Sequence, residues 1–132
     1  SSVATYLFAP VWIGFILLLD PITYWLGGTA LLGDLARGDA GRCYRLLLAG
    51  AVCGLLWEFW NYWAAGKWHY TLPYPLDFGP RYFEMPLPGF LGFLPFGVEC
   101  FCLHQFAWTL WQRWRLSRRA LGWEGSLPES RV

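Results

Sequence analysis

Three stretches of apolar residues alternate with polar, Pro-containing connectors along the chain. The apolar stretches cover residues 6–26, 44–65 and 89–111. Each holds about 20 residues, and a helix rises roughly 1.5 Å per residue, so each is long enough to cross a membrane. The pattern therefore predicts an all-α integral membrane protein, a single domain over residues 1–132 with three transmembrane helices.

The connectors differ in character. Residues 27–45 are polar, and a short interfacial helix is expected from Thr29 to Ala36 within them. Residues 66–89 are too polar and too rich in Pro to span a membrane, so they are expected to form an ordered outer loop held by aromatic side chains. The basic tail, residues 112–132, loses hydrophobic periodicity and is expected to fray.

The start of the third span is ambiguous because Pro95 lies inside it. One reading begins the helix near Phe90 with a kink at Pro95. The other makes Pro95 the first helical residue, a position that Pro favours. In that second case residues 86–94 would dip into the interface without crossing.

Composition supports the membrane reading and excludes two other classes. Hydrophobic residues make up 56% of the chain and charged residues only 14%, where soluble domains average about 25% charged residues. Such hydrophobicity excludes disorder. The net charge of +1 leaves no basic surplus for nucleic acid. The expected partners are membrane lipids and other transmembrane proteins, or a second copy of this chain.

Basic residues orient the chain. Arginines gather in the first connector and in the tail, at Arg37, Arg42, Arg45, Arg113, Arg115, Arg118, Arg119 and Arg131. The loop between the second and third spans has only Lys67 and Arg81. The positive-inside rule places the connector and the C-terminal tail in the cytoplasm. Aromatic anchors are expected at the outer interface, at Trp57, Trp60, Trp63, Trp68 and Tyr70.

Polar residues inside the spans are the candidate sites, namely Asp20, Glu58, Asn61, Glu99 and His104. Carboxylates in hydrocarbon are costly and persist when they are paired, neutral or face a cavity. Glu58 and Asn61 share one helical face with Gly50 and Gly54, which let another helix approach closely. We expect Glu58 to clamp a neighbouring helix by a hydrogen bond; the alternative makes it a proton donor or a cofactor contact.

Two pairings follow from counting depth along the spans. Glu58 and Glu99 lie at similar depths if the third helix starts near Phe90, and could then share a proton. Asp20 and His104 both fall in the inner half, where a hydrogen bond between them is expected. The alternative for His104 is a ligand to a metal or to the magnesium of a chlorin.

The cysteines are Cys43, Cys53, Cys100 and Cys102. Three of them lie in apolar stretches, which argues against a disulfide framework. They are expected to be buried, free thiols, and no metal site is predicted.

Two segments carry a family resemblance. The sequences LLWEFWNYWAAGKWHYTLPY, residues 55–74, and FEMPLPGFLGFLPFGVEC, residues 83–100, resemble small bacterial membrane proteins and, more remotely, the lycopene cyclase domain of carotenoid cyclases. Pro88 and Gly89 stand where that family tends to have paired acids. The resemblance implies a bacterial inner-membrane protein and, for the cyclases, ring closure of a polyene by a carboxylic acid. Glu58, Glu84 and Glu99 would be the candidate donors.

These features indicate two alternative functions. The first is an accessory or structural subunit of a larger membrane complex, photosynthetic or respiratory, that packs against partner helices and binds pigment, quinone or lipid. The second is a lycopene-cyclase-like enzyme acting on a carotenoid, with Glu58 and Glu99 as catalytic acids. A transporter ranks last because no inverted repeat is evident.

Overall fold

The computed structural model describes residues 2–69 and 79–121, with side chains from residue 13 onward. Three long helices dominate the fold: α1 (Ser2–Trp25), α3 (Gly41–Trp63) and α5 (Leu94–Ala120). The short helix α2 (Leu31–Ala36) joins α1 to α3. A small hairpin, β1 (Arg81–Tyr82) and β2 (Met85–Pro86), and the one-turn helix α4 (Leu87–Phe90) precede α5.

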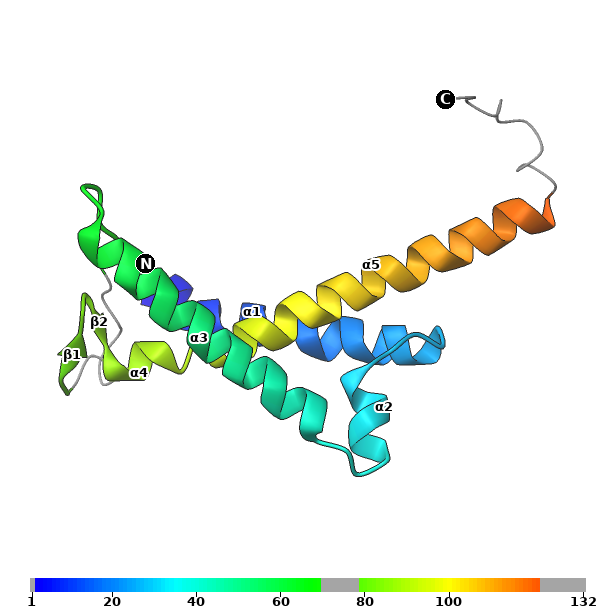
Figure 1. Ribbon diagram of the computed structural model, residues 1–132, viewed down its shortest axis with the longest axis horizontal. Coiled ribbons are helices and arrows are strands. Elements are labelled where there is room, and N and C mark those ends of the chain that lie inside the picture. Colours follow the sequence, from blue (N-terminus) through cyan, green and yellow to red (C-terminus); the bar gives the residue numbers. More distant parts are fainter. Residues whose placement is uncertain (1, 70–78, 122–132) are drawn as a thin grey trace, which may run out of the picture.

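Helix α5 is the central element, and both other long helices pack on it. Residues Asp20 and Cys102 lie together, and Leu26 meets Arg113 further along, so α1 runs parallel to α5. Helix α3 runs antiparallel to α5, because Gly50 packs on its start and Arg42 lies over Phe101. Consecutive long helices therefore alternate in direction, as three consecutive membrane crossings require. In Figure 1, α2 lies at one end of α3, and the hairpin lies towards the other.

Helices α3 and α5 cross at a wide angle (Figure 1) and touch backbone to backbone. A Cβ atom on Gly97 would lie 3.0 Å from the Gly50 nitrogen and would overlap the Leu46 carbonyl oxygen. A Cβ atom on Gly54 would lie 2.5 Å from the Phe93 ring. Glycine is therefore required where these helices cross, as in other close helix contacts in membranes.

The hairpin folds the outer loop back on α3. Its strands pair antiparallel, with Arg81 opposite Pro86 and Tyr82 opposite Met85. Phe83, in the turn, has a φ of 57°, which is uncommon for a residue other than glycine. Its ring packs on Phe59 and Tyr62 of α3 at centroid distances of 6.5 and 5.3 Å. These ring contacts offset the backbone strain and hold the hairpin on the helix.

The structure confirms a mostly helical fold. Helix α3 and the segment Leu87–Ala120 are long and apolar enough to cross a membrane, and Ile13–Trp25 is a shorter apolar stretch. A short helix, α2, is present within the segment Thr29 to Ala36 where one was expected.

The third long helix has one of the two expected starts but extends further than expected at its C-terminal end. The helix starts at Leu94 with Pro95 in its first turn, and α4 with residues 91–93 precedes it. This is the second of the two alternatives, and it arises because Pro lacks the N–H group that a helix interior needs but its first turn does not. The helix also continues to Ala120, so residues 112–120 are helical and not frayed. Cation–π stacking of Arg115 on Trp111 and of Arg118 on Trp114 accompanies this extension.

Buried side chains are nearly as often polar as apolar. Among the described side chains, seven buried residues are apolar, namely Leu19, Ala30, Leu31, Met85, Pro86, Val98 and Cys102, and six are polar or charged. Large apolar side chains are exposed on all three long helices, including Leu17, Leu48, Trp60 and Leu110. Large exposed apolar surfaces are typical of sites that contact other proteins or a membrane.

Candidate functional site

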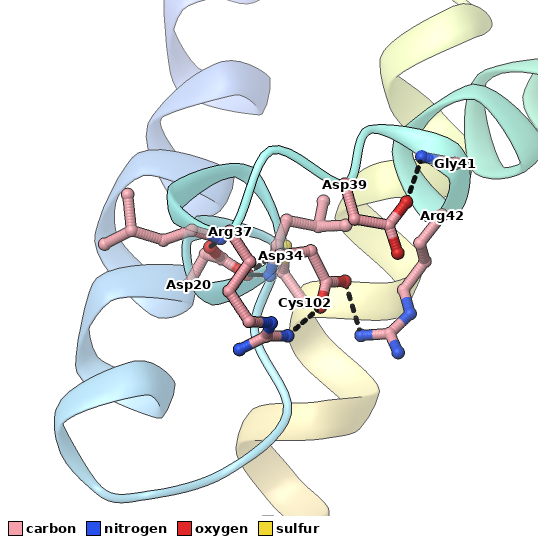
Figure 2. A network of polar contacts seen from close by, with 9 residues as sticks. Asp20, Asp34, Arg37, Asp39, Gly41, Arg42 and Cys102 are labelled. Carbon is pink, nitrogen blue, oxygen red and sulfur yellow. Dashed lines mark hydrogen bonds and ion pairs between the residues drawn. The ribbon is translucent and has the colours of Figure 1, made fainter.

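The inner polar network joins the connector to α1 and α5, and consists of Asp20, Asp34, Arg37, Arg42 and Cys102 (Figure 2). The Asp20 carboxylate is 6% exposed. It accepts hydrogen bonds from the backbone nitrogens of Leu31 at 2.8 Å and Leu32 at 2.7 Å. These are the first N–H groups of α2, which have no partner within their own helix. A carboxylate in α1 thus fixes the start of α2.

Asp34 is the second acid of the inner polar network. Its carboxylate is 5% exposed and lies between two guanidinium groups. Its oxygens lie 2.6 Å from Arg37 Nη2 and 2.7 Å from Arg42 Nη1. Arg37 caps the end of α2, and Arg42 comes from the first turn of α3. Asp34 therefore binds two arginines from neighbouring elements, one on each side of its carboxylate, as Figure 2 shows.

A polar cavity of about 290 Å³ opens beside these arginines. It lies between the end of α1, the turn that follows it, and α2. Its lining residues are Tyr24, Gly27, Gly28, Thr29, Ala30, Gly33, Asp34, Arg37 and Arg42. Two arginines and one aspartate give this lining a net charge of +1.

The outer polar site lies at the other end of α3 and is built around Glu58 and Asn61. Both side chains are buried, and Glu58 is completely so. The Asn61 amide pairs with the backbone of Trp68: its nitrogen donates to the Trp68 carbonyl at 3.0 Å, and its oxygen accepts from the Trp68 nitrogen at 2.7 Å. The Asn61 amide thus pairs with both backbone groups of Trp68, as a neighbouring strand would, and holds the outer loop at the end of α3.

A second set of charges lies on this loop. Lys67 Nζ is 3.1 Å from one Glu84 carboxylate oxygen and 4.7 Å from the centre of the Tyr62 ring. His69 Nδ1 is 3.7 Å from the other Glu84 oxygen. Glu84 therefore binds the loop near Lys67 to the hairpin turn.

The expected face of α3 is the buried one, because its buried residues are Gly50, Gly54, Glu58 and Asn61. The Glu58–Glu99 pair was conditional on a third helix that starts near Phe90, and that condition is not met because α5 starts at Leu94. Gly97 packs against Gly50, and Glu58 lies eight residues beyond Gly50, which is about 12 Å along α3. Since α3 and α5 are antiparallel, Glu99 lies in the opposite direction from this crossing. Helix α5 starts against Gly50, near the middle of α3, so Glu58 and Glu99 lie on opposite sides of the crossing.

The expected Asp20–His104 hydrogen bond is wrong. The Asp20 carboxylate instead accepts hydrogen bonds from the start of α2, and the Cys102 sulfur lies 3.7 Å from one of its oxygens. Cys102 and His104 are two residues apart and so face different sides of α5. His104 is exposed and stacks on Trp108 with the rings 10° from parallel.

The prediction that the cysteines are buried is confirmed for Cys102 but wrong for Cys53 and Cys100. All four are free thiols; Cys102 is buried, Cys43 is partly buried, and Cys53 and Cys100 are exposed. No cluster of metal-ligating side chains occurs within the residues that the structure describes.

The outer aromatic side chains point away from the helix contacts. Trp57, Trp60, Trp63 and Trp68 are each more than half exposed, and Tyr70 lies outside the described residues. Their gathering at one end of α3 is the arrangement expected of anchors at a membrane interface.

Several structural contacts were not anticipated. Thr23 and Thr109 are buried between α1 and α5, where a Cβ atom on Gly28 would contact both. The roles of Asp34 and of Gly97 were also missed. Opposite charges three residues apart, at Asp34 and Arg37, were the available signal for the first.

No family model, curated protein or solved structure matches this chain.

Proposed function

We propose that this chain is a three-crossing membrane protein that serves as a helix-packing subunit of a larger membrane assembly. The observation that carries the proposal is the exposure of the apolar helix faces. Only 17% of the apolar stretch of α3 and 11% of that in Leu87–Ala120 is buried, so most of each helix is available to lipid or to a partner helix. The buried side chains meanwhile form polar contacts, and these are worth most where water is absent.

The proposed orientation places α2 and the C-terminal part of α5 on the cytoplasmic side of a bacterial inner membrane. Arg113 donates to the Leu26 carbonyl at 3.0 and 3.2 Å, which puts the end of α1 level with the basic part of α5. The arginines of the connector and of α5 thus share one end of the protein. The positive-inside rule makes that end cytoplasmic.

The subunit proposal is tested by photo-crosslinking in membranes. A benzophenone amino acid replaces Leu48 or Leu56, which are 66% and 53% exposed on α3, and replaces Arg115 as a control beyond the proposed membrane boundary. We expect one defined protein adduct from the α3 positions, with a partner or a second copy, and no such adduct from Arg115. Lipid adducts alone, together with a monomer in mild detergent, would contradict the proposal.

The carotenoid cyclase is a second candidate, favoured by one observation. An apolar groove of about 380 Å³ lies between α3, α4 and the hairpin and suits a long apolar ligand. Its lining residues are Ala51, Leu55, Tyr82, Leu87, Phe90, Leu91 and Leu94. This lining contains no carboxyl group, so an acid would have to reach the groove from elsewhere.

The two candidates are separated by Glu58→Gln and Glu99→Gln. Both substitutions preserve side-chain size and remove the acid. The subunit proposal expects the same carotenoid composition from cells expressing either variant or the parent chain, measured by liquid chromatography. General acid catalysis contributes about 10²–10⁴-fold, so loss of a cyclised carotenoid in one variant would favour the enzyme.

A further inference from the structure

We infer that the polar cavity beside Asp34 is a binding site for the phosphate group of an anionic phospholipid in the cytoplasmic leaflet. The inference rests on the proposed membrane location and adds a ligand class to it. Three features carry it: two arginines held by Asp34, a net positive charge of the lining, and exposed apolar side chains next in sequence to lining residues.

Contacts within the fold fix the positions of Arg37 and Arg42. Asp34 is fixed on α2, and the start of α2 is held by the buried Asp20 carboxylate. The chain of contacts from α1 through α2 therefore sets the position of Arg37 and Arg42. A guanidinium has five N–H donors. The ion pair with Asp34 engages one nitrogen of each, which leaves donors on both for a further anion.

Charge favours an anion here. Asp34 is the one acid among the residues that line the cavity, against two arginines. The two other acids in Figure 2, Asp20 and Asp39, are not among the lining residues. Asp39 accepts the Gly41 backbone N–H at 2.8 Å, and Asp20 accepts the N–H groups at the start of α2. Arginine forks match phosphate oxygens in geometry as well as in charge. Basic pockets beside transmembrane helices on the cytoplasmic side recognise anionic lipid headgroups in this way.

Exposed apolar side chains next in sequence to lining residues favour a lipid over a free phosphate ion. Trp25 follows the lining residue Tyr24 and is 80% exposed. Leu32 and Leu35 flank the lining residues of α2 and are 42% and 51% exposed. A ligand with a phosphate in the cavity and acyl chains on these side chains would cover both kinds of surface. A free ion would leave these apolar side chains uncovered.

The test uses the full chain, purified and delipidated in a neutral detergent. Phosphatidylglycerol, phosphatidylcholine and inorganic phosphate are titrated separately, and the thermal unfolding midpoint is followed by tryptophan fluorescence. A ligand that binds only the folded state raises the midpoint with its concentration. We expect phosphatidylglycerol to raise it at concentrations where zwitterionic phosphatidylcholine and inorganic phosphate do not.

Substitutions localise the effect. Arg37 is 69% exposed, so Arg37→Gln leaves the fold intact, and loss of a charge-assisted contact should weaken phosphatidylglycerol binding about tenfold. Arg37→Lys keeps the charge without the fork and should recover part of the affinity. The matched control is Arg45→Gln, which removes one charge from the same connector outside the cavity lining and should change the affinity less than about twofold.

Three results would overturn the inference: equal effects of Arg37→Gln and Arg45→Gln, equal binding of phosphatidylcholine, or the full stabilisation by inorganic phosphate. The last would reassign the cavity to a free anion. Extraction of cell membranes with alkaline carbonate tests the membrane location separately. A chain that stays in the membrane but shows no lipid preference therefore refutes this inference alone.

Discussion

The close backbone contact between α3 and α5 can be tested by comparing two helical glycines, Gly97 at the crossing and Gly14 away from it. Both Gly97→Ala and Gly14→Ala add one methyl group inside a helix. At Gly97 the new Cβ would meet the Leu46 carbonyl and the Gly50 nitrogen, both of them backbone atoms. At Gly14 nothing lies within 4 Å of the same methyl group.

The magnitude follows from this difference. Replacing glycine by alanine in a helix interior stabilises it by about 1 kcal/mol, and this gain is common to both variants. Backbone atoms cannot rotate away as a side chain does, so at Gly97 the helices must separate, and overpacking of this kind costs about 1–3 kcal/mol. The free energy of unfolding should therefore be about 1–3 kcal/mol lower for Gly97→Ala than for Gly14→Ala.

The assay is unfolding in mixed micelles with increasing dodecyl sulfate, followed by tryptophan fluorescence and by circular dichroism. The helical signal before unfolding should be unchanged in both variants, which shows that the helices themselves persist. Equal free energies for the two variants would refute the close backbone crossing. A greater stability of Gly97→Ala would do so more strongly.

Two further predictions concern the polar contacts. Asn61→Ala leaves the Trp68 N–H and carbonyl without their side-chain partner, so trypsin should cleave after Lys67 several-fold faster than in the parent chain; unchanged cleavage would contradict the pairing. Asp20→Ala removes both acceptors at the start of α2 and should lower the free energy of unfolding by about 2–4 kcal/mol, at about 1–2 per bond. Asp20→Asn keeps one acceptor and should cost about half as much in the same dodecyl sulfate titration.

The sequence predicted the long helices well because hydrophobic length is a strong local signal. Helices α1 and α3 begin and end within about four residues of the apolar stretches seen in the sequence. The buried face of α3 was also predictable, because the helical period alone places Gly50, Gly54, Glu58 and Asn61 in one stripe. These inferences need no knowledge of the other helices.

What the sequence could not supply was the register between helices. The depth argument for Glu58 and Glu99 assumed that the end of α3 and the start of α5 lie at the same surface. Helix α5 instead starts at Leu94, and its first residues lie against Gly50, near the middle of α3. Equal residue counts from the end of α3 and from the start of α5 therefore do not correspond to equal depths. Likewise, the apolar stretch around His104 gives no sign that the start of α2 occupies Asp20, because that contact joins residues 11 and 12 positions apart through a turn.

The two polar sites share a mode of action that bears on function. Asp20 binds the backbone of α2 at one end of the fold, and Asn61 binds the backbone of Trp68 at the other. Each side chain lies in a long helix and satisfies N–H groups of a connector, which would otherwise lack partners in an environment with little water. Polar residues within apolar helices need not therefore mark chemistry, and here these two fix the loops. Fixed loops keep the exposed apolar helix faces in one arrangement, as a subunit that packs against partner helices requires.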